Sequence, residues 1–151
     1  QVAVDAVLSA RHNHIFPSVT KAGHSAIFST TGNDDCHVIL RGGREPNFDA
    51  ASVQAGCDLL AAAGLPPRLM VDLSHANSSK DHERQKIAGA SIAEQLQSAP
   101  QNVMGVMIES HLVAGRQLLG DDLVYGQSVT DACIGWDDTL ALLDQLAAAK
   151  R

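Results

Sequence analysis

The chain has few aromatic residues and no excess of positive charge. Only 3% of its 151 residues are Phe, Trp or Tyr, so it offers no platform on which nucleic-acid bases could stack. It has 11 Lys and Arg against 17 Asp and Glu, a formal net charge of −6, whereas binding to a phosphate backbone requires a basic surface. Nucleic acid is therefore not expected as the main partner, although a local basic pocket for a small phosphorylated ligand is compatible with this charge.

Long apolar runs and paired cysteines are also missing. No apolar run approaches about 18 residues, which argues against a membrane span. The three cysteines, Cys36, Cys57 and Cys133, form no CxxC pair, so we expect no disulfide framework and a reducing, cytoplasmic location. No signal-peptide pattern is visible, and the first residue is Gln1 rather than Met, so we expect a trimmed or internal piece of a longer protein.

From about residue 36 onward, short apolar runs alternate with amphipathic stretches. The runs predict strands at 36–40, 69–73 and 103–108, each nearly continuous in Val, Ile, Leu or Met, as in parallel strands covered on both faces. Helices are predicted at 49–63, 81–97 and 137–149, the second capped by Ser78 or Ser79. Three βα units, at about 36–64, 69–97 and 103–149, predict an α/β fold with a parallel sheet.

The first 35 residues follow a different pattern. Residues before about Ala10 resemble the end of a helix, and 14–20 and 25–31 predict a β-hairpin, at about 14–31 overall. Because a complete (β/α)8 barrel needs about 250 residues, the three units form either a small open sheet or the closing part of a barrel.

Polar residues follow each apolar run. RGGREPN occupies 41–47, SHANSSK occupies 74–80 and ESHL occupies 109–112. Since the carboxyl ends of parallel strands meet at one edge of a sheet, where α/β folds bind their ligands, we expect these residues to form one site.

Several of these residues are candidates for binding chemistry, each with a plainer alternative. Arg41, followed by two glycines, can hold phosphate or carboxylate with its guanidinium fork, or can pair with a carboxylate in an ordinary turn. His75 and Glu109, one βα unit apart, are candidate ligands for Zn, Mn, Fe or Co. Alternatively, His75 is a structural histidine bonded to a backbone carbonyl. Asp131 either adds a second carboxylate or caps the last helix.

The remaining histidines and Cys133 carry weaker arguments. Cys133 is a metal ligand by type, but a buried structural cysteine is favoured by its apolar setting. His111 either supports the site or is merely exposed. The other histidines carry no local argument and are treated as background: His12, His14, His24, His37 and His82.

Long stretches of the chain resemble one enzyme family. They are HVILRGGREPN (37–47), DLSHANSSK (72–80), VMIESHLVAG (106–115), YGQSVTDACIGWDDT (125–139) and SVTKAGHSAIFSTTGN (18–33). In order and over nearly the whole length, they resemble the type I 3-deoxy-D-arabino-heptulosonate 7-phosphate (DAHP) synthases. The resemblance implies that residues 1–151 are the C-terminal part of a single (β/α)8 barrel (TIM barrel) catalytic domain.

The resemblance also implies a reaction and a metal site. The family joins phosphoenolpyruvate to erythrose 4-phosphate, the entry to the shikimate pathway, and requires a divalent metal ion. Three of its four metal ligands match here as His75, Glu109 and Asp131, whereas the fourth, a Cys, belongs upstream. Arg41 is expected to bind phosphoenolpyruvate, and Arg41 and His75 are the expected catalytic residues.

Other implications concern regulation and what lies outside this sequence. An aromatic amino acid effector is expected near the hairpin, with Ser18 as one contact, and the complete enzyme is expected to be a homo-oligomer. A KPRT segment serving the sugar phosphate belongs upstream, so the chain alone is expected to be inactive. Two alternatives stay open: a related phosphoenolpyruvate-condensing barrel, such as a 3-deoxy-octulosonate 8-phosphate synthase, and a non-catalytic half-barrel binding module.

Overall fold

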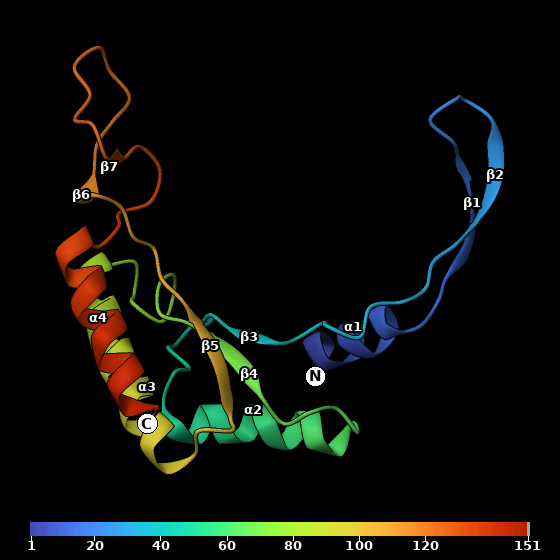
Figure 1. Cartoon of the computed structure of the whole chain (residues 1–151), viewed down its shortest axis with the longest axis horizontal. Coiled ribbons are helices and arrows are strands. Elements are labelled where there is room, and N and C mark those ends of the chain that lie inside the picture. Colours follow the sequence, from blue (N-terminus) through green and yellow to red (C-terminus); the bar gives the residue numbers. More distant parts are fainter. Residues whose placement is uncertain (151) are drawn as a thin grey trace. The chain divides into compact units, whose positions relative to one another are not determined.

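The computed structural model describes residues 1–150, which form two compact units that divide between Val38 and Ile39 (Figure 1). Each unit has its own architecture. Within the described residues, no helix has the length and apolar character needed to cross a membrane.

The first unit is a helix followed by a β-hairpin. Helix α1 spans Val2–Arg11, and strands β1 (Ile15–Val19) and β2 (Ser25–Ser29) pair antiparallel along their whole length. Phe16 and Phe28 are direct cross-strand partners, and their rings stack with centroids 6.1 Å apart. The predicted hairpin and the helix before it are confirmed.

The second unit is built on a three-stranded parallel sheet. Its strands are β3 (Ile39–Leu40), β4 (Leu69–Asp72) and β5 (Val103–Met107), in the order β3-β4-β5. The predicted α/β class and parallel sheet are confirmed. The first strand is shorter than the predicted 36–40. Ile39 pairs with Met70, and β4 begins at Leu69, only one residue before Met70, so β4 offers almost no partner to the residues before Ile39.

Three helices follow the three strands. They are α2 (Ala50–Ala62), α3 (Gln85–Ser98) and α4 (Trp136–Ala149), each close to its predicted range. Asp49 caps α2 by accepting a hydrogen bond from the Ser52 amide at 2.9 Å, and hydrogen bonds from Ser52 lower the pKa of the Asp49 carboxyl.

The predicted cap of the second helix is wrong. Neither Ser78 nor Ser79 caps α3; a short 3-10 turn, His82–Arg84, precedes it, and Asp81 caps that turn. The physical reason is the backbone of Ser79 and Lys80, whose φ angles of 54° and 63° are left-handed and delay the helix.

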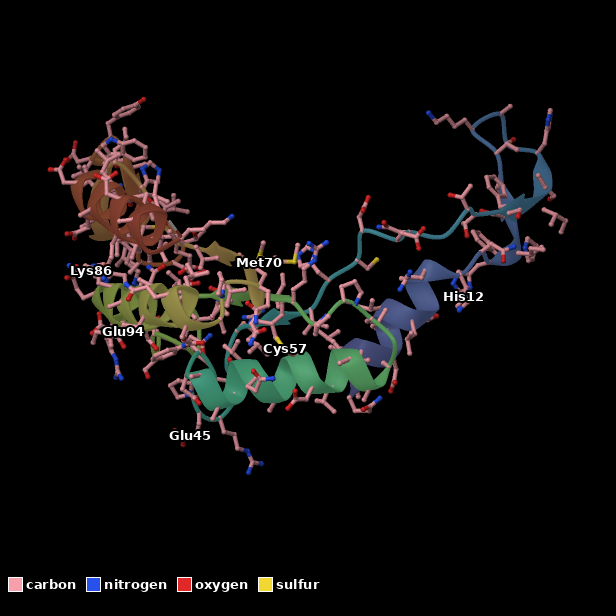
Figure 2. All side chains as sticks on the ribbon, turned by 60° about the horizontal axis from the view of Figure 1, so that its bottom comes forward. His12, Glu45, Cys57, Met70, Lys86 and Glu94 are labelled. Atoms are coloured by element: carbon pink, nitrogen blue, oxygen red, sulfur yellow. The ribbon has the colours of Figure 1, made fainter. Side chains whose placement is uncertain are left out.

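The helices cover one face of the sheet and leave the other open. Leu69, Val71 and Leu73 are fully buried on the helix side, and α3 and α4 lie side by side (Figure 1). On the opposite side, Ile39 is 40% exposed and Met107 is 38% exposed. Figure 2 shows this division, with Cys57 between α2 and the sheet and Met70 on the sheet's other side. The core therefore lies between the sheet and its helices.

The sequence analysis missed one small element. Strands β6 (Val113–Arg116) and β7 (Gln127–Ser128) pair with each other between β5 and α4. They are too short and too irregular in register to produce an alternating apolar pattern. The loop that joins them leaves Leu118 and Tyr125 almost fully exposed.

Candidate functional site

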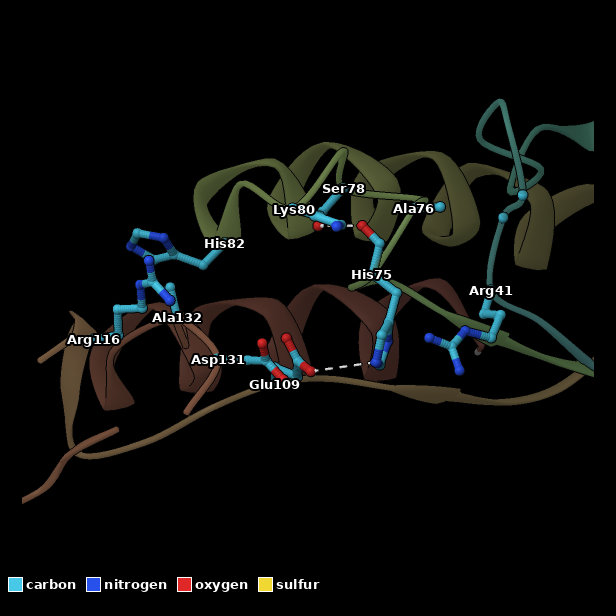
Figure 3. Close-up of a pocket in the computed structure, with 12 residues that line it drawn as sticks. Arg41, His75, Ala76, Ser78, Lys80, His82, Glu109, Arg116, Asp131 and Ala132 are labelled. Atoms are coloured by element: carbon cyan, nitrogen blue, oxygen red, sulfur yellow. Dashed lines mark hydrogen bonds and ion pairs between the residues drawn. The ribbon is translucent and has the colours of Figure 1, made fainter. Parts of the chain in front are cut away.

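A single pocket of about 590 Å³ gathers the polar residues at the carboxyl ends of β3, β4 and β5 (Figure 3). The structure therefore brings together the segments that the sequence analysis expected to converge. Its lining residues are Arg41, Gly42, Gly43, His75, Ala76, Ser78, Lys80, His82, Glu109, Arg116, Asp131 and Ala132. All four main candidates, Arg41, His75, Glu109 and Asp131, are among them.

Arg41 is presented by a loop that two amide side chains, the half-buried Asn47 and the buried Asn77, hold in place. Asn47 accepts a hydrogen bond from the Gly42 amide at 2.8 Å, and Asn77 accepts one from the Asn47 amide at 2.7 Å. Asn77 also donates to the Leu40 carbonyl at 3.1 Å, so it ties the end of β3 to the loop after β4. In residues 1–150, no carboxylate forms an ion pair with Arg41, and its guanidinium points toward the middle of the pocket (Figure 3). The plainer alternative of a turn arginine paired with a carboxylate is not what the structure shows.

His75 occupies the middle of the pocket in an unusual backbone conformation. Its φ is 54°, in the left-handed region that a residue with a side chain rarely adopts. Its Nδ1 lies 2.7 Å from Oδ2 of Asp72, and its Nε2 lies 3.6 Å from Oε1 of Glu109. The plainer alternative, a ring bonded to a backbone carbonyl, is wrong because both ring nitrogens face carboxylates.

Glu109 lies just beyond the end of β5 and is anchored through its backbone. The buried side chain of Gln85 accepts from the Glu109 amide at 2.9 Å and donates to the Glu109 carbonyl at 3.0 Å. Burial raises the pKa of the Glu109 carboxyl, and the nearby charges of Asp131 and Asp72 raise it further, while His75 and Arg41 act in the opposite direction. Carboxylates gathered around one imidazole in this way favour the binding of a cation.

Asp131 belongs to the pocket rather than to the last helix. The N-cap of α4 is Gly135, so the alternative in which Asp131 caps this helix is wrong. Cys133 does not line the pocket; its buried thiol donates to the Asp131 carbonyl at 3.5 Å, and burial raises its pKa. This contact fits the favoured structural role of Cys133. His111 is exposed and also lies outside the pocket, where its Nδ1 accepts from the Leu112 amide at 2.8 Å.

The donors in the pocket suit a divalent metal ion chemically. As the described residues stand, no three His, Cys, Asp or Glu side chains enclose a metal position. The pocket nevertheless offers one imidazole and two carboxylates, His75, Glu109 and Asp131, a mixed nitrogen and oxygen set that suits first-row transition metals. The residues present therefore fit such an ion by their chemistry.

Sequence reasoning missed several basic side chains of the pocket. His82, treated as background, lines it, with its ring nitrogens 3.4 Å from a Glu83 oxygen and 4.0 Å from an Asp81 oxygen. Arg116 also lines it, beside His82 in Figure 3, and comes from the strand that was not predicted. Lys80 is the last residue of the SHANSSK segment. Its position after the second predicted strand was the signal in the sequence that could have assigned it to the pocket.

Comparison with known proteins shows the family to which this α/β chain belongs. The model of the DAHP synthetase I family matches residues 1–144, and the chain belongs to this family. It is 54% identical to the Phe-sensitive phospho-2-dehydro-3-deoxyheptonate aldolase of Escherichia coli K12, over 99% of this chain and 43% of that protein. It is 51% identical to the phospho-2-dehydro-3-deoxyheptonate aldolase of Haemophilus influenzae, over 99% of this chain and 42% of that protein.

A solved structure gives the same result. The phospho-2-dehydro-3-deoxyheptonate aldolase of Francisella tularensis superposes with a TM-score of 0.92 at 47% identity, over 99% of this chain and 45% of that one. The chain thus spans less than half the length of the relatives it matches.

Proposed function

We propose that this pocket is part of an active site that joins phosphoenolpyruvate to erythrose 4-phosphate, giving DAHP and phosphate at the start of aromatic amino acid biosynthesis. The observation that carries the proposal is the convergence of Arg41, His75, Glu109 and Asp131 on one pocket, in a chain 54% identical to an enzyme named for this product. The names of the relatives favour DAHP over an octulosonate product. A non-catalytic module gives no reason for this convergence of chemically capable side chains.

The fold proposal is that residues 1–151 are the C-terminal part of one (β/α)8 catalytic domain. An all-parallel sheet is normally covered on both faces, whereas here only the helix side of β3-β4-β5 is covered. Beside β5 lies an apolar groove of about 270 Å³, lined by residues that include Met104, Val106, Leu143 and Leu146. The open face, the unpaired edges and this groove support a sheet that continues into further βα units.

The residues of the pocket have two different roles, substrate binding and metal binding. Arg41 holds the phosphate or carboxylate of phosphoenolpyruvate through its planar fork, which restricts the angle at which the enol carbon approaches the sugar aldehyde. His75, Glu109 and Asp131 hold a divalent metal ion, together with a ligand from outside this sequence. When bound, such an ion supplies Lewis acidity to a substrate oxygen that gains negative charge.

Regulation is assigned to the hairpin. Ser18 lies on β1, two residues from the stacked Phe16, and we propose that it contacts an aromatic amino acid effector. Relatives named Phe-sensitive, Trp-sensitive and tyrosine-inhibited support this assignment. We also propose that the complete enzyme is a homo-oligomer and that it is located in the cytoplasm. The free thiols of Cys36, Cys57 and Cys133 accord with a reducing compartment.

The test uses a chimera, in which this chain is joined to the part of the Escherichia coli relative that it does not match. The assay measures phosphate release from phosphoenolpyruvate. We expect activity that requires both substrates and is abolished by a chelator. His75→Ala should remove both the bound metal and the activity. If the metal content and the rate are unchanged in this variant, the ligand assignment is wrong.

Arg41 is tested in the same chimera. Arg41→Ala should raise KM for phosphoenolpyruvate roughly 10- to 100-fold, since a hydrogen bond to a charged group contributes about 1.5–3 kcal/mol, and should change the KM for the sugar phosphate much less. Arg44→Ala is the matched control, because Arg44 lies in the same loop but does not line the pocket. Equal effects of Arg41→Ala on the two substrates would refute the role of Arg41.

A further inference from the structure

A buried carboxylate lies directly behind the imidazole of His75. Asp72 is the last residue of β4 and is only 1% exposed. Its Oδ1 accepts hydrogen bonds from the Ser74 amide at 2.8 Å and the Ser74 hydroxyl at 2.6 Å. Its Oδ2 lies 2.7 Å from Nδ1 of His75. Asp72 is therefore surrounded by donors, which stabilise its charge in a buried position.

These contacts determine which nitrogen of His75 carries the hydrogen. An ionised carboxylate can only accept, so Nδ1 must donate to Asp72. The Ser74 oxygen also lies 2.8 Å from Nδ1, but its hydrogen already points to Asp72, so it too can only accept. Glu109 also faces the ring, but its Oε1 lies 3.6 Å from Nε2, too far for a hydrogen bond, whereas Oδ2 of Asp72 lies 2.7 Å from Nδ1. The single hydrogen of the neutral ring is therefore on Nδ1, and the lone pair of Nε2 is on the side that faces Glu109.

The backbone around His75 needs such an anchor. At a φ of 54°, the His75 backbone is strained, and a strained conformation persists only where its surroundings hold it. Asn77 fixes the Asp72 backbone by donating to its carbonyl at 2.7 Å, so the carboxylate itself is held by the end of β4. The ring of His75 is consequently fixed relative to the sheet and not only relative to its own loop.

We infer that Asp72 is a positioning residue, which selects the Nδ1–H tautomer of His75 and directs Nε2 into the pocket as a metal ligand. A carboxylate bonded to the second nitrogen of a ligating histidine fixes the tautomer and raises its basicity. The metal-ligand part of this inference rests on the proposed function, whereas the tautomer part does not.

The tautomer can be measured directly in the 151-residue chain. We expect the imidazole ¹⁵N chemical shifts of His75, recorded on the neutral ring at alkaline pH, to show hydrogen on Nδ1. Hydrogen on Nε2 in the unmodified protein would overturn the inference, and this measurement needs no variant to fold.

Two variants separate positioning from mere stabilisation of the loop. In Asp72→Asn, the amide keeps an oxygen for Ser74 but places an NH₂ donor against Nδ1, so the hydrogen should move to Nε2. Ser74→Ala removes the hydroxyl and keeps the carboxylate, so the hydrogen should stay on Nδ1. A loss of folding stability in Asp72→Asn without a change of tautomer would show a structural role alone and refute the inference.

Metal binding gives the second readout, with Co²⁺ as the probe and its visible absorption as the signal. Asp72→Asn should weaken Co²⁺ binding about 10- to 100-fold, the usual effect of losing such a partner, and Ser74→Ala should weaken it much less. Unchanged affinity in Asp72→Asn would contradict the positioning role. If the unmodified chain and the active chimera both fail to bind Co²⁺, the metal site of the proposed function fails instead, and the ¹⁵N shifts still decide the role of Asp72.

Discussion

Single residues in the pocket adopt backbone conformations that few side chains permit, and Gly42 is the clearest case. Its φ is 76°, and a Cβ added there would lie 2.8 Å from the Ala76 Cβ and 2.9 Å from the Asn77 amide nitrogen. At the neighbouring Gly43 an added Cβ would meet nothing within 4 Å. Of the two glycines after Arg41, only the first is therefore required for close packing, which brings the Arg41 loop against the loop that carries His75.

The two glycines make a matched pair for mutation. Gly42→Ala should lower the free energy of unfolding by about 1–3 kcal/mol, because a left-handed conformation alone costs about 1–2 kcal/mol for a residue with a Cβ. Gly43→Ala should change it by less than about 0.5 kcal/mol. Urea unfolding of the 151-residue chain measures both, and equal effects of the two substitutions would show that the close approach at Gly42 is unimportant.

At the level of secondary structure elements, Gln85 joins the start of α3 to the end of β5. It is fully buried, and its side-chain amide accepts a hydrogen bond from the Glu109 N–H and donates one to the Glu109 carbonyl, as the backbone of a neighbouring strand would. Glu109 therefore owes its place in the pocket to a helix as well as to its own strand.

Replacing Gln85 by Met keeps the volume and removes both hydrogen bonds. The Glu109 carbonyl still accepts from the Ile134 amide at 3.0 Å, so only the Glu109 amide is left unpaired. We expect a loss of about 1–3 kcal/mol for this group, together with faster hydrogen exchange at the Glu109 amide. Gln97→Met on the same helix is the control, since Gln97 is exposed and should tolerate the change. Exchange at Glu109 that is no faster in Gln85→Met than in the control would contradict this role.

The elements differ in how far the sequence could predict them. Apolar runs and helix periodicity predicted the three parallel strands and their helices, because burial against a helix leaves a direct pattern. For Asp131, only the family resemblance assigned a place in the metal site, whereas the argument from strand ends placed Arg41, His75 and Glu109 at one edge. It could not find Gln85 or Asp72, because their hydrogen-bond partners are set by tertiary packing, and it missed β6, which is too short for a periodic pattern.

At the scale of the whole molecule, the sheet of the second unit has two unpaired edge strands among the described residues. In residues 1–150, β3 and β5 each have only β4 as a neighbour. Unpaired strands with apolar surroundings recruit other strands, and the groove beside β5 adds apolar surface that includes Met104, which is 42% exposed. The chain thus carries a surface suited to further polypeptide, in accord with relatives more than twice its length.

This surface predicts how the chain associates. Alone, the 151-residue chain should self-associate and show no turnover. Mixed with a separate polypeptide comprising the part of the Escherichia coli relative that it does not match, it should form a one-to-one complex and gain activity. Met104→Lys should weaken both kinds of association, because it places a charge in the apolar groove beside β5. Leu118→Lys is the control, since Leu118 is 85% exposed and lies outside the groove. Sedimentation velocity measures both associations, and a monomeric isolated chain with full activity would contradict the continuing sheet.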